Sequence, residues 1–167
     1  DLKSIYFRTA SIGYAVGSDG TILYSTNGGT IWTAATVDAD SDLTSVALLS
    51  NLTVIAVGRD GQVYLSTDDG VTYSEAEDIP DDLLSTNWNA ISRTHIGGAY
   101  TTYIVGNSGA MIRTADGTTW TDISTLGPDL VIPNLLSVSA GSTSSTLWVP
   151  WGSNKFAYST DSGDTFT

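Results

Sequence analysis

The sequence predicts an all-β protein, a β-propeller of four-stranded antiparallel blades in which four repeats are visible. Three observations lead to this prediction. The 167 residues include 24 Thr and 21 Ser but only two Glu and two Lys, a mixture that favours strands and turns over helices. Segments of similar pattern recur along the chain. Each recurrence holds four short strand candidates, and four strands every 40 to 50 residues is typical of a propeller blade.

The repeats align on a Ser or Thr that precedes a glycine turn. These residues are Ser25, Ser66, Thr114 and Ser159, and successive ones are 41, 48 and 45 positions apart. We therefore expect one domain over 1–167, with blades at approximately 1–36, 42–78, 86–124 and 133–167. The last repeat stops one residue after its aromatic residue, so the four blades are expected to belong to a larger propeller. A closed four-bladed ring is the alternative.

Within a repeat, each strand has its own pattern. In the first repeat, the first strand alternates apolar positions at Ile5 and Phe7, and the second is the continuous apolar run 14–16. The third alternates from Ile22, and the fourth is expected to start at the aromatic residue, Trp32. Glycine-rich pairs between the second and third strands indicate hairpin turns.

The turn between the third and fourth strands carries the motif S/T-x-D-x-G-x-T-aromatic. The second and fourth repeats fit it completely, whereas the first has Asn27 for Asp and Ile31 for Thr, and the third is one residue shorter before Gly117. The motif positions are Ser25, Asn27, Gly29 and Trp32; Ser66, Asp68, Gly70, Thr72 and Tyr73; Thr114, Asp116, Gly117, Thr119 and Trp120; and Ser159, Asp161, Gly163, Thr165 and Phe166.

This motif is similar to the Asp-box, or bacterial neuraminidase repeat, and the pattern over 17–32 most resembles photosystem II assembly-factor-like repeats. The same box occurs in sialidases, xyloglucan-cleaving glycosidases, sortilin-type receptors and phage tail proteins. The short Asp can accept hydrogen bonds from its own turn, the glycine can supply a positive φ, and the aromatic residue can pack between blades. We therefore expect the box residues to be structural and not catalytic.

Composition excludes several classes of function. The net charge of −12 repels phosphate backbones, so a nucleic-acid partner is not expected. No apolar run approaches the ~20 residues that span a bilayer, so membrane insertion is not expected. The absence of Cys excludes disulfides, thiol catalysis and Cys-based zinc sites. No cofactor is expected.

The sequence does not predict an enzyme. A sialidase needs three arginines for the substrate carboxylate, a Tyr–Glu pair and an acid Asp, but Arg8, Arg59, Arg93 and Arg113 are scattered over three repeats. The single His95 stands in a loop-like stretch without a Ser or Cys partner at a recognisable spacing. A fragment of a sialidase or other glycoside hydrolase, with its catalytic groups elsewhere, is the alternative.

Two further groups of residues are weaker candidates. Asp38, Asp40 and Asp42 have the spacing of a calcium loop but lack its glycine and its terminal Glu, so at most weak Ca²⁺ binding is expected. The tryptophans outside the box are Trp88, Trp148 and Trp151. They could bind a ligand by stacking, or they could pack between blades.

The sequence thus predicts a non-enzymatic binding or structural module that recognises protein or glycan and can join a larger complex. A virion appendage such as a phage tail, or another extracellular surface protein, suits an acidic chain with few lysines. The alternative is a photosystem assembly-factor-like protein of the periplasm or thylakoid lumen. That resemblance implies a basic surface for membrane-protein partners, which the scattered arginines do not match.

Overall fold

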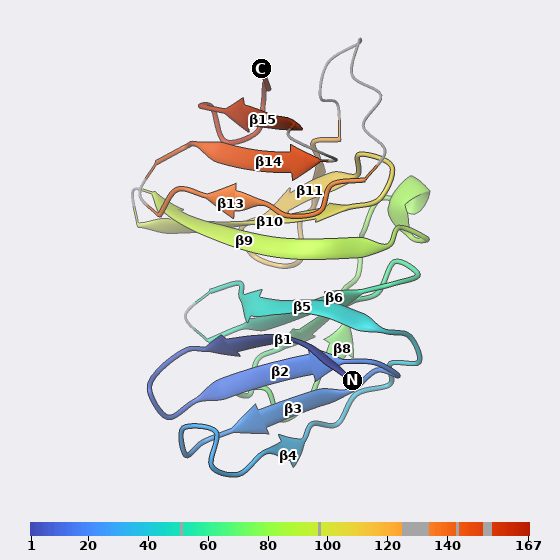
Figure 1. Ribbon diagram of the computed structural model, residues 1–167, viewed down its shortest axis with the longest axis vertical. Helices are drawn as coiled ribbons and strands as arrows, with labels where there is room; N and C mark the ends of the chain where they lie inside the picture. Colours follow the sequence, from blue (N-terminus) through green and yellow to red (C-terminus); the bar gives the residue numbers. More distant parts are fainter. Residues whose placement is uncertain (51, 97, 125–133, 143, 152–154) are drawn as a thin grey trace.

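The computed structural model describes residues 1–50, 52–96, 98–124, 134–142, 144–151 and 155–167. It contains four antiparallel sheets and one short 3-10 turn, η1 (Asp81–Leu83), so the all-β prediction is confirmed (Figure 1). Among these residues, no helix is both long and apolar enough to cross a membrane.

Three sheets have four strands that follow one another in chain order. The first contains β1 (Leu2–Phe7), β2 (Gly13–Gly17), β3 (Ile22–Ser25) and β4 (Thr33–Ala34). The second contains β5 (Leu43–Leu48), β6 (Val54–Gly58), β7 (Val63–Ser66) and β8 (Ser74–Glu75). The third contains β9 (Trp88–Ile96), β10 (Ala99–Gly106), β11 (Met111–Thr114) and β12 (Thr121–Asp122).

The fourth sheet contains β13 (Ser139–Ala140), β14 (Leu147–Trp151) and β15 (Lys155–Ser159). Thr167 lies beside β15, where it and Tyr158 exchange two backbone hydrogen bonds of 3.0 Å. We refer to the four sheets, in chain order, as blades one to four.

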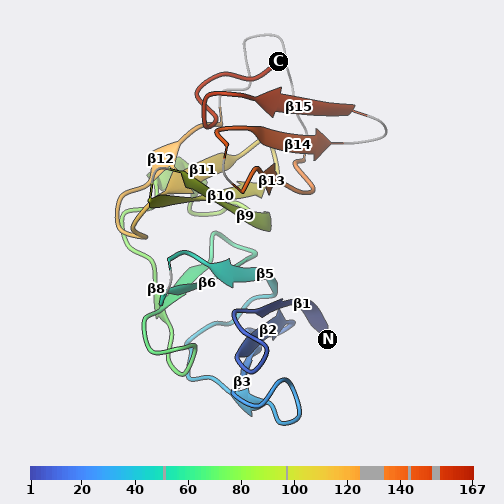
Figure 2. The same cartoon turned by 90° about the vertical axis from the view of Figure 1, so that its left-hand side faces the viewer.

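The blades lie one after another along an arc, with blades one and four at its two ends (Figures 1 and 2). The first strands form its inner edge, where β1 contacts β5, β5 contacts β9 and β9 contacts β13. The short strands β8 and β12 lie on the opposite side of the arc (Figure 2). This is the arrangement of consecutive blades in part of a propeller.

The apolar core is divided among the three contacts between neighbouring blades. Separate clusters of buried side chains join blades one and two, two and three, and three and four. Alternate side chains of a strand point to opposite faces of its sheet, and in blade two both faces are covered. All five residues of β6 are therefore buried, as a strand packed on two sides requires.

Two details differ from the predictions. In blades one, two and three, the fourth strand begins one residue after the box aromatic residue, at Thr33, Ser74 and Thr121. His95 was expected in a loop but lies in β9, which pairs with β10 as far as Ile96. The longer hairpin is supported by ring stacking between His95 and Tyr100, whose centroids lie 4.3 Å apart.

Candidate functional site

All four Asp-box turns share one hydrogen bond. The hydroxyl of the first box residue accepts the N–H of the box glycine at 2.9 Å in every blade. The same hydroxyl donates to the side-chain oxygen of the box Asp or Asn. That oxygen in turn accepts backbone N–H groups at 2.8–2.9 Å, from Ile31, Thr72, Thr118, Thr119 and Thr165.

These bonds stabilise the ionised form of each box carboxyl. The N–H of Thr72 holds the pKa of Asp68 at about 2, and the N–H of Thr119 does the same for Asp116. In blade four the Thr165 hydroxyl, which donates at 2.6 Å, is the main cause of a pKa of about 2 at Asp161. A carboxylate so acidic is a poor proton donor near neutral pH, which supports the structural role expected for the box.

The box position requires glycine for two reasons, its positive φ and the close packing around it. Gly29, Gly70, Gly117 and Gly163 have φ values of 83°, 81°, 81° and 90°. A Cβ on Gly70 would lie 2.6 Å from Tyr14 of the preceding blade, so the turn packs directly on its neighbour. Two of the box aromatic residues also join neighbouring blades: Tyr73 is buried in the cluster between blades one and two, and the Trp120 indole N–H donates to the Glu77 carbonyl at 3.1 Å.

The three tryptophans outside the box differ in placement. Trp88 is fully buried between blades two and three, and its indole N–H donates to the Gly61 carbonyl at 3.4 Å. This burial fits the packing alternative and leaves no face for a ligand. Trp148 is 45% exposed and stacks on Tyr158 with the ring centroids 5.2 Å apart. The Trp151 side chain lies outside the described part of the structure.

The expected calcium ligands are not gathered into a site. Asp42 forms an ion pair with Lys3, whose hydrogen bond lowers the pKa of that carboxyl. Asp40 accepts a hydrogen bond from the Gln62 amide, and Asp38 uses its backbone carbonyl to accept the Tyr64 hydroxyl at 2.9 Å. In the described ranges, no three acidic or histidine side chains are grouped so that they could hold a metal ion.

The arginines are separated in space as well as in sequence, so the arrangement a sialidase needs is absent from the described residues. Arg8 and Arg113 join neighbouring blades through Asp69 and Asp164, the latter at 2.8 Å. Arg59 lies 3.7 Å from Asp42. Arg93 differs from these three, because it has no carboxylate partner within the described part of the chain.

Arg93 borders a hollow at the inner edge of the arc, which we call the inner groove. It has a volume of about 390 Å³ and is lined by residues of β1, β5 and β9, including Ser4, Tyr6, Ser45 and Ser92. The Arg93 guanidinium lies 4.4 Å from the centroid of the Tyr100 ring and donates to the Ser50 carbonyl at 3.3 Å. Hydroxyls and a cation that pairs with no described carboxylate thus lie together where three blades meet.

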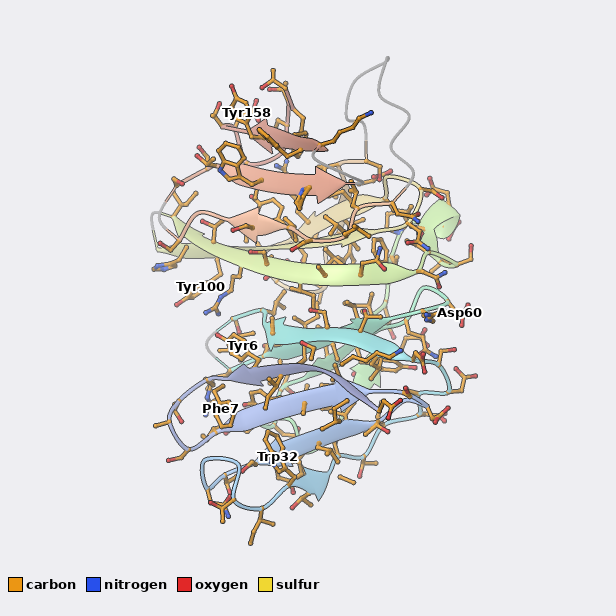
Figure 3. The ribbon with its side chains drawn as sticks, in the orientation of Figure 1. Tyr6, Phe7, Trp32, Asp60, Tyr100 and Tyr158 are labelled. Atoms are coloured by element: carbon orange, nitrogen blue, oxygen red, sulfur yellow. The ribbon has the colours of Figure 1, made fainter. Side chains whose placement is uncertain are left out.

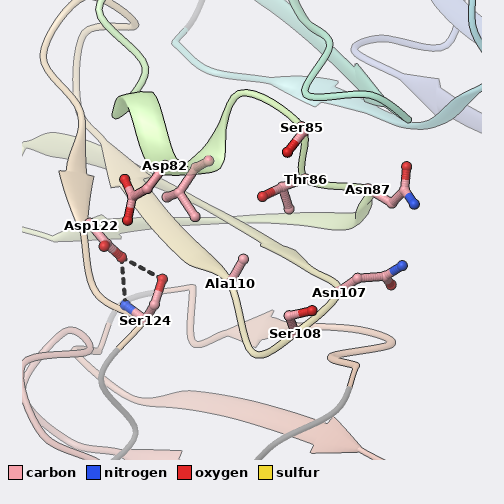
Figure 4. A pocket seen from close by; sticks show the side chains of 10 residues that line it. Asp82, Ser85, Thr86, Asn87, Asn107, Ser108, Ala110, Asp122 and Ser124 are labelled. Atoms are coloured by element: carbon pink, nitrogen blue, oxygen red, sulfur yellow. Dashed lines mark hydrogen bonds between the residues drawn. The ribbon is translucent and has the colours of Figure 1, made fainter.

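A second hollow of about 380 Å³ lies between η1 and the start of the loop after β12 (Figure 4). Its lining is polar and includes Asp82, Asn87, Asn107 and Asp122. The Asp122 carboxylate accepts the N–H of Ser124 at 2.8 Å and also its hydroxyl (Figure 4). Asp122 is therefore engaged with its own loop, and the residues that line this hollow supply no cationic group.

The sequence analysis did not foresee the inner groove, because its walls come from three different repeats.

The sequence matches the family described as Photosynthesis system II assembly factor YCF48 over residues 1–123. The chain belongs to this family. Among solved structures it resembles YCF48 from Cyanidioschyzon merolae, with 20% identity, a TM-score of 0.71, and coverage of 99% of this chain and 55% of that one. It thus spans about half the length of that YCF48 chain. No curated protein gives a significant match.

Two further structures have the same fold. A YCF48 bound to D1 peptide is 18% identical with a TM-score of 0.61, covering 99% of this chain and 67% of that one. An ancestral GH74 enzyme is 18% identical with a TM-score of 0.68, covering 95% of this chain but 25% of the enzyme. Membership of the YCF48 family favours the assembly-factor alternative, and none of these comparisons supports the expected virion role or a glycan partner.

Proposed function

We propose that this protein is a non-enzymatic assembly factor of the YCF48 type that binds an extended segment of a partner protein in the inner groove. The observation that carries the proposal is Arg93, a half-buried cation whose charge no described carboxylate neutralises, at the edge of a hydroxyl-lined hollow. Family membership supports it, as does the solved YCF48 that is bound to D1 peptide.

The groove has the chemistry that an extended peptide requires. The hydroxyls of Ser4 and Ser92 already accept the N–H groups of Val46 and Ala140, so they can donate their O–H groups to carbonyls of a peptide backbone. The Ser45 hydroxyl can donate to a carbonyl or accept an N–H group. The Arg93 guanidinium is planar and stacks against Tyr100, so its position is restrained and its edge can pair with a carboxylate. A segment that presents an acidic side chain or a terminal carboxylate next to an extended backbone fits this lining best.

The site chemistry supports binding and not catalysis. The box carboxylates are occupied by their own turns, and three of the arginines pair with aspartates. The likeness to a GH74 enzyme covers only 25% of that enzyme and supports a shared fold. Membership of the family supports placing this proposed role in the thylakoid lumen or an equivalent compartment.

The test is the binding of a fluorescent D1 peptide, measured by anisotropy, to the wild-type chain and to Arg93→Gln. Loss of a charge-assisted hydrogen bond costs about 1.5–3 kcal/mol, so Arg93→Gln should weaken binding about tenfold or more. Arg59→Gln is the matched control, because Arg59 is more exposed and pairs with Asp42 away from the groove. No binding by the wild type, or equal losses in both variants, would refute the proposal.

A further inference from the structure

The hairpin of β9 and β10 is longer than its counterparts and is held by the blades on both sides. These strands have nine and eight residues, whereas the first two strands of blades one and two have six and five. The buried Thr94 donates its hydroxyl to backbone carbonyls of blade four, and the N–H of His95 donates to the Ser142 carbonyl there at 3.2 Å. On the other side, Arg93 donates to the Ser50 carbonyl of blade two. The side chains of this hairpin are therefore presented on a well-supported backbone.

Three side chains of the hairpin contact one another, and we call them the hairpin stack. Arg93 and His95 are two residues apart on β9, so they project from the same face of the sheet. Tyr100 pairs with His95 across the hairpin. The centroids of the Tyr100 and His95 rings lie 4.3 Å apart with 28° between their planes, and the Arg93 guanidinium lies 4.4 Å from the Tyr100 centroid. One aromatic ring thus contacts both side chains.

The surroundings of the hairpin stack contain no acidic group to neutralise it. His95 is exposed, and its own strand and β10 bring Arg93 and Tyr100 to it. The neighbouring segments of blade two, 49–53, and blade four, 139–146, have no acidic or basic residue in their sequence. Among the described residues, neither Arg93 nor His95 forms an ion pair. A ligand here meets one permanent cation and one side chain of a type that ordinarily gains its charge between pH 8 and 5.

The hairpin stack continues the inner groove. Arg93 belongs to both, because it lines the groove and also contacts Tyr100. Figure 3 shows Tyr100 and Tyr6, another residue of the groove, on the same side of the molecule, at the left of the view. An extended segment that lies in the groove and pairs with Arg93 can therefore continue to His95.

We propose that His95 is a second carboxylate-binding residue of this site, which selects a partner segment with two carboxylates two residues apart. The inference rests on the proposed function of the inner groove. In an extended segment, residues i and i+2 point to the same side and lie about 6–7 Å apart, which is also the spacing of Arg93 and His95 along β9. One carboxylate pairs with the Arg93 guanidinium, and the other accepts an N–H of the protonated imidazole.

The Tyr100 ring has a defined part in this arrangement. Its face can contact a guanidinium or a protonated imidazole, because the ring quadrupole attracts cations. It thereby holds both cationic side chains at the groove without neutralising either of them. Binding of the doubly acidic segment should strengthen as the pH falls and His95 becomes protonated.

The experiment is fluorescence anisotropy with a rhodamine-labelled, amidated peptide, Ser-Ala-Asp-Ala-Asp-Ala-Ser, at about pH 8 and about pH 5.5, where both of its aspartates are ionised. The wild type should bind about three- to fivefold more tightly at the lower pH, as one exposed ion pair allows. His95→Gln should keep the affinity measured at the higher pH and lose the difference. His95→Lys, which is charged at both pH values, should bind tightly at both. Arg59→Gln is the matched control and should keep the wild-type difference.

The outcomes separate this inference from the proposed function. Equal wild-type affinities at the two pH values, a pH difference that survives in His95→Gln, or weak binding by His95→Lys would overturn the role of His95. The groove itself would still be supported if Arg93→Gln weakened binding of the D1 peptide. If the acidic peptide did not bind at either pH, the role of His95 would be refuted, and the D1 peptide measurement would decide the proposed function by itself.

Discussion

The contact between blades one and two and the outer face of blade one present the same box turn in different surroundings. In both turns the glycine N–H meets the Ser hydroxyl at 2.9 Å, at Gly29 and at Gly70. Gly70 is buried against Tyr14, whereas Gly29 is half-buried and its nearest side chains, Phe7 and Trp32, belong to its own blade. The turn therefore forms from its own hydrogen bonds, and packing against a neighbour is a separate contribution that the next blade supplies.

The largest expected difference between a contact inside the arc and an exposed face is in the free energy of unfolding lost when a tryptophan is removed. Trp88→Ala should lower the free energy of unfolding by about 3–5 kcal/mol, because it leaves a large cavity between blades two and three. Trp148→Ala should cost about 1 kcal/mol, mainly from lost ring contacts with Tyr158 and Phe156. Urea unfolding measures both. Similar losses in the two variants would contradict the division between buried and open faces.

The next largest difference is at the box glycines. Gly29→Ala should cost about 1–2 kcal/mol, since a side chain at this positive φ is strained. Gly70→Ala adds a clash with Tyr14 at 2.6 Å and should cost about 1–3 kcal/mol more. The same urea-unfolding measurement compares the two variants. If Gly29→Ala were as damaging as Gly70→Ala, packing would not be the separate contribution inferred above.

A smaller difference is expected at the first box residue. Ser66→Ala removes a hydroxyl that donates to the Asp68 carboxylate at 2.8 Å, and bonds to charged groups contribute about 1.5–3 kcal/mol. Ser25→Ala removes a hydroxyl that donates to the neutral Asn27 amide at 3.0 Å, where about 0.5–1.5 kcal/mol is usual. Thermal or urea unfolding should rank Ser66→Ala as the more damaging, and the reverse order would be inconsistent with a charged box.

The smallest effect depends on pH. The Asp68 carboxyl has a pKa of about 2 when folded, and about 3.9 is usual for an unfolded chain. Its ionised form therefore stabilises the fold fully above about pH 4, and this contribution is lost as the pH falls towards 2. Asp68→Asn should unfold more easily than the wild type at neutral pH but not at pH 2. Asn27→Asp should introduce the same pH dependence into blade one, and its absence there would contradict this account.

The sequence predicted the parts of the fold that are local. Ser66, Asp68 and Gly70 lie within five residues of one another, so the composition of the motif determines the turn. For Trp88 the sequence left packing and ligand binding open, and the structure decides for packing, with Trp88 and its repeat counterpart Leu43 both fully buried. The inner groove was not predictable, because Ser4, Ser45 and Arg93 are brought together only by the order of the blades.

Ion pairs between blades were unpredictable for the same reason. Arg8 and Asp69 are 61 residues apart, and among sixteen aspartates no spacing rule selects this one. That no carboxylate of the described residues pairs with Arg93 could likewise be recognised only from the structure.

Strands that contact one another belong to one blade or to adjacent blades. Each described blade is then a module that meets the others at one or two junctions, and every junction uses the same kind of contact. Duplication or deletion of a module would create one new junction of a familiar kind and leave the others undisturbed. Proteins of this architecture can therefore gain or lose blades in evolution without a new kind of contact between blades.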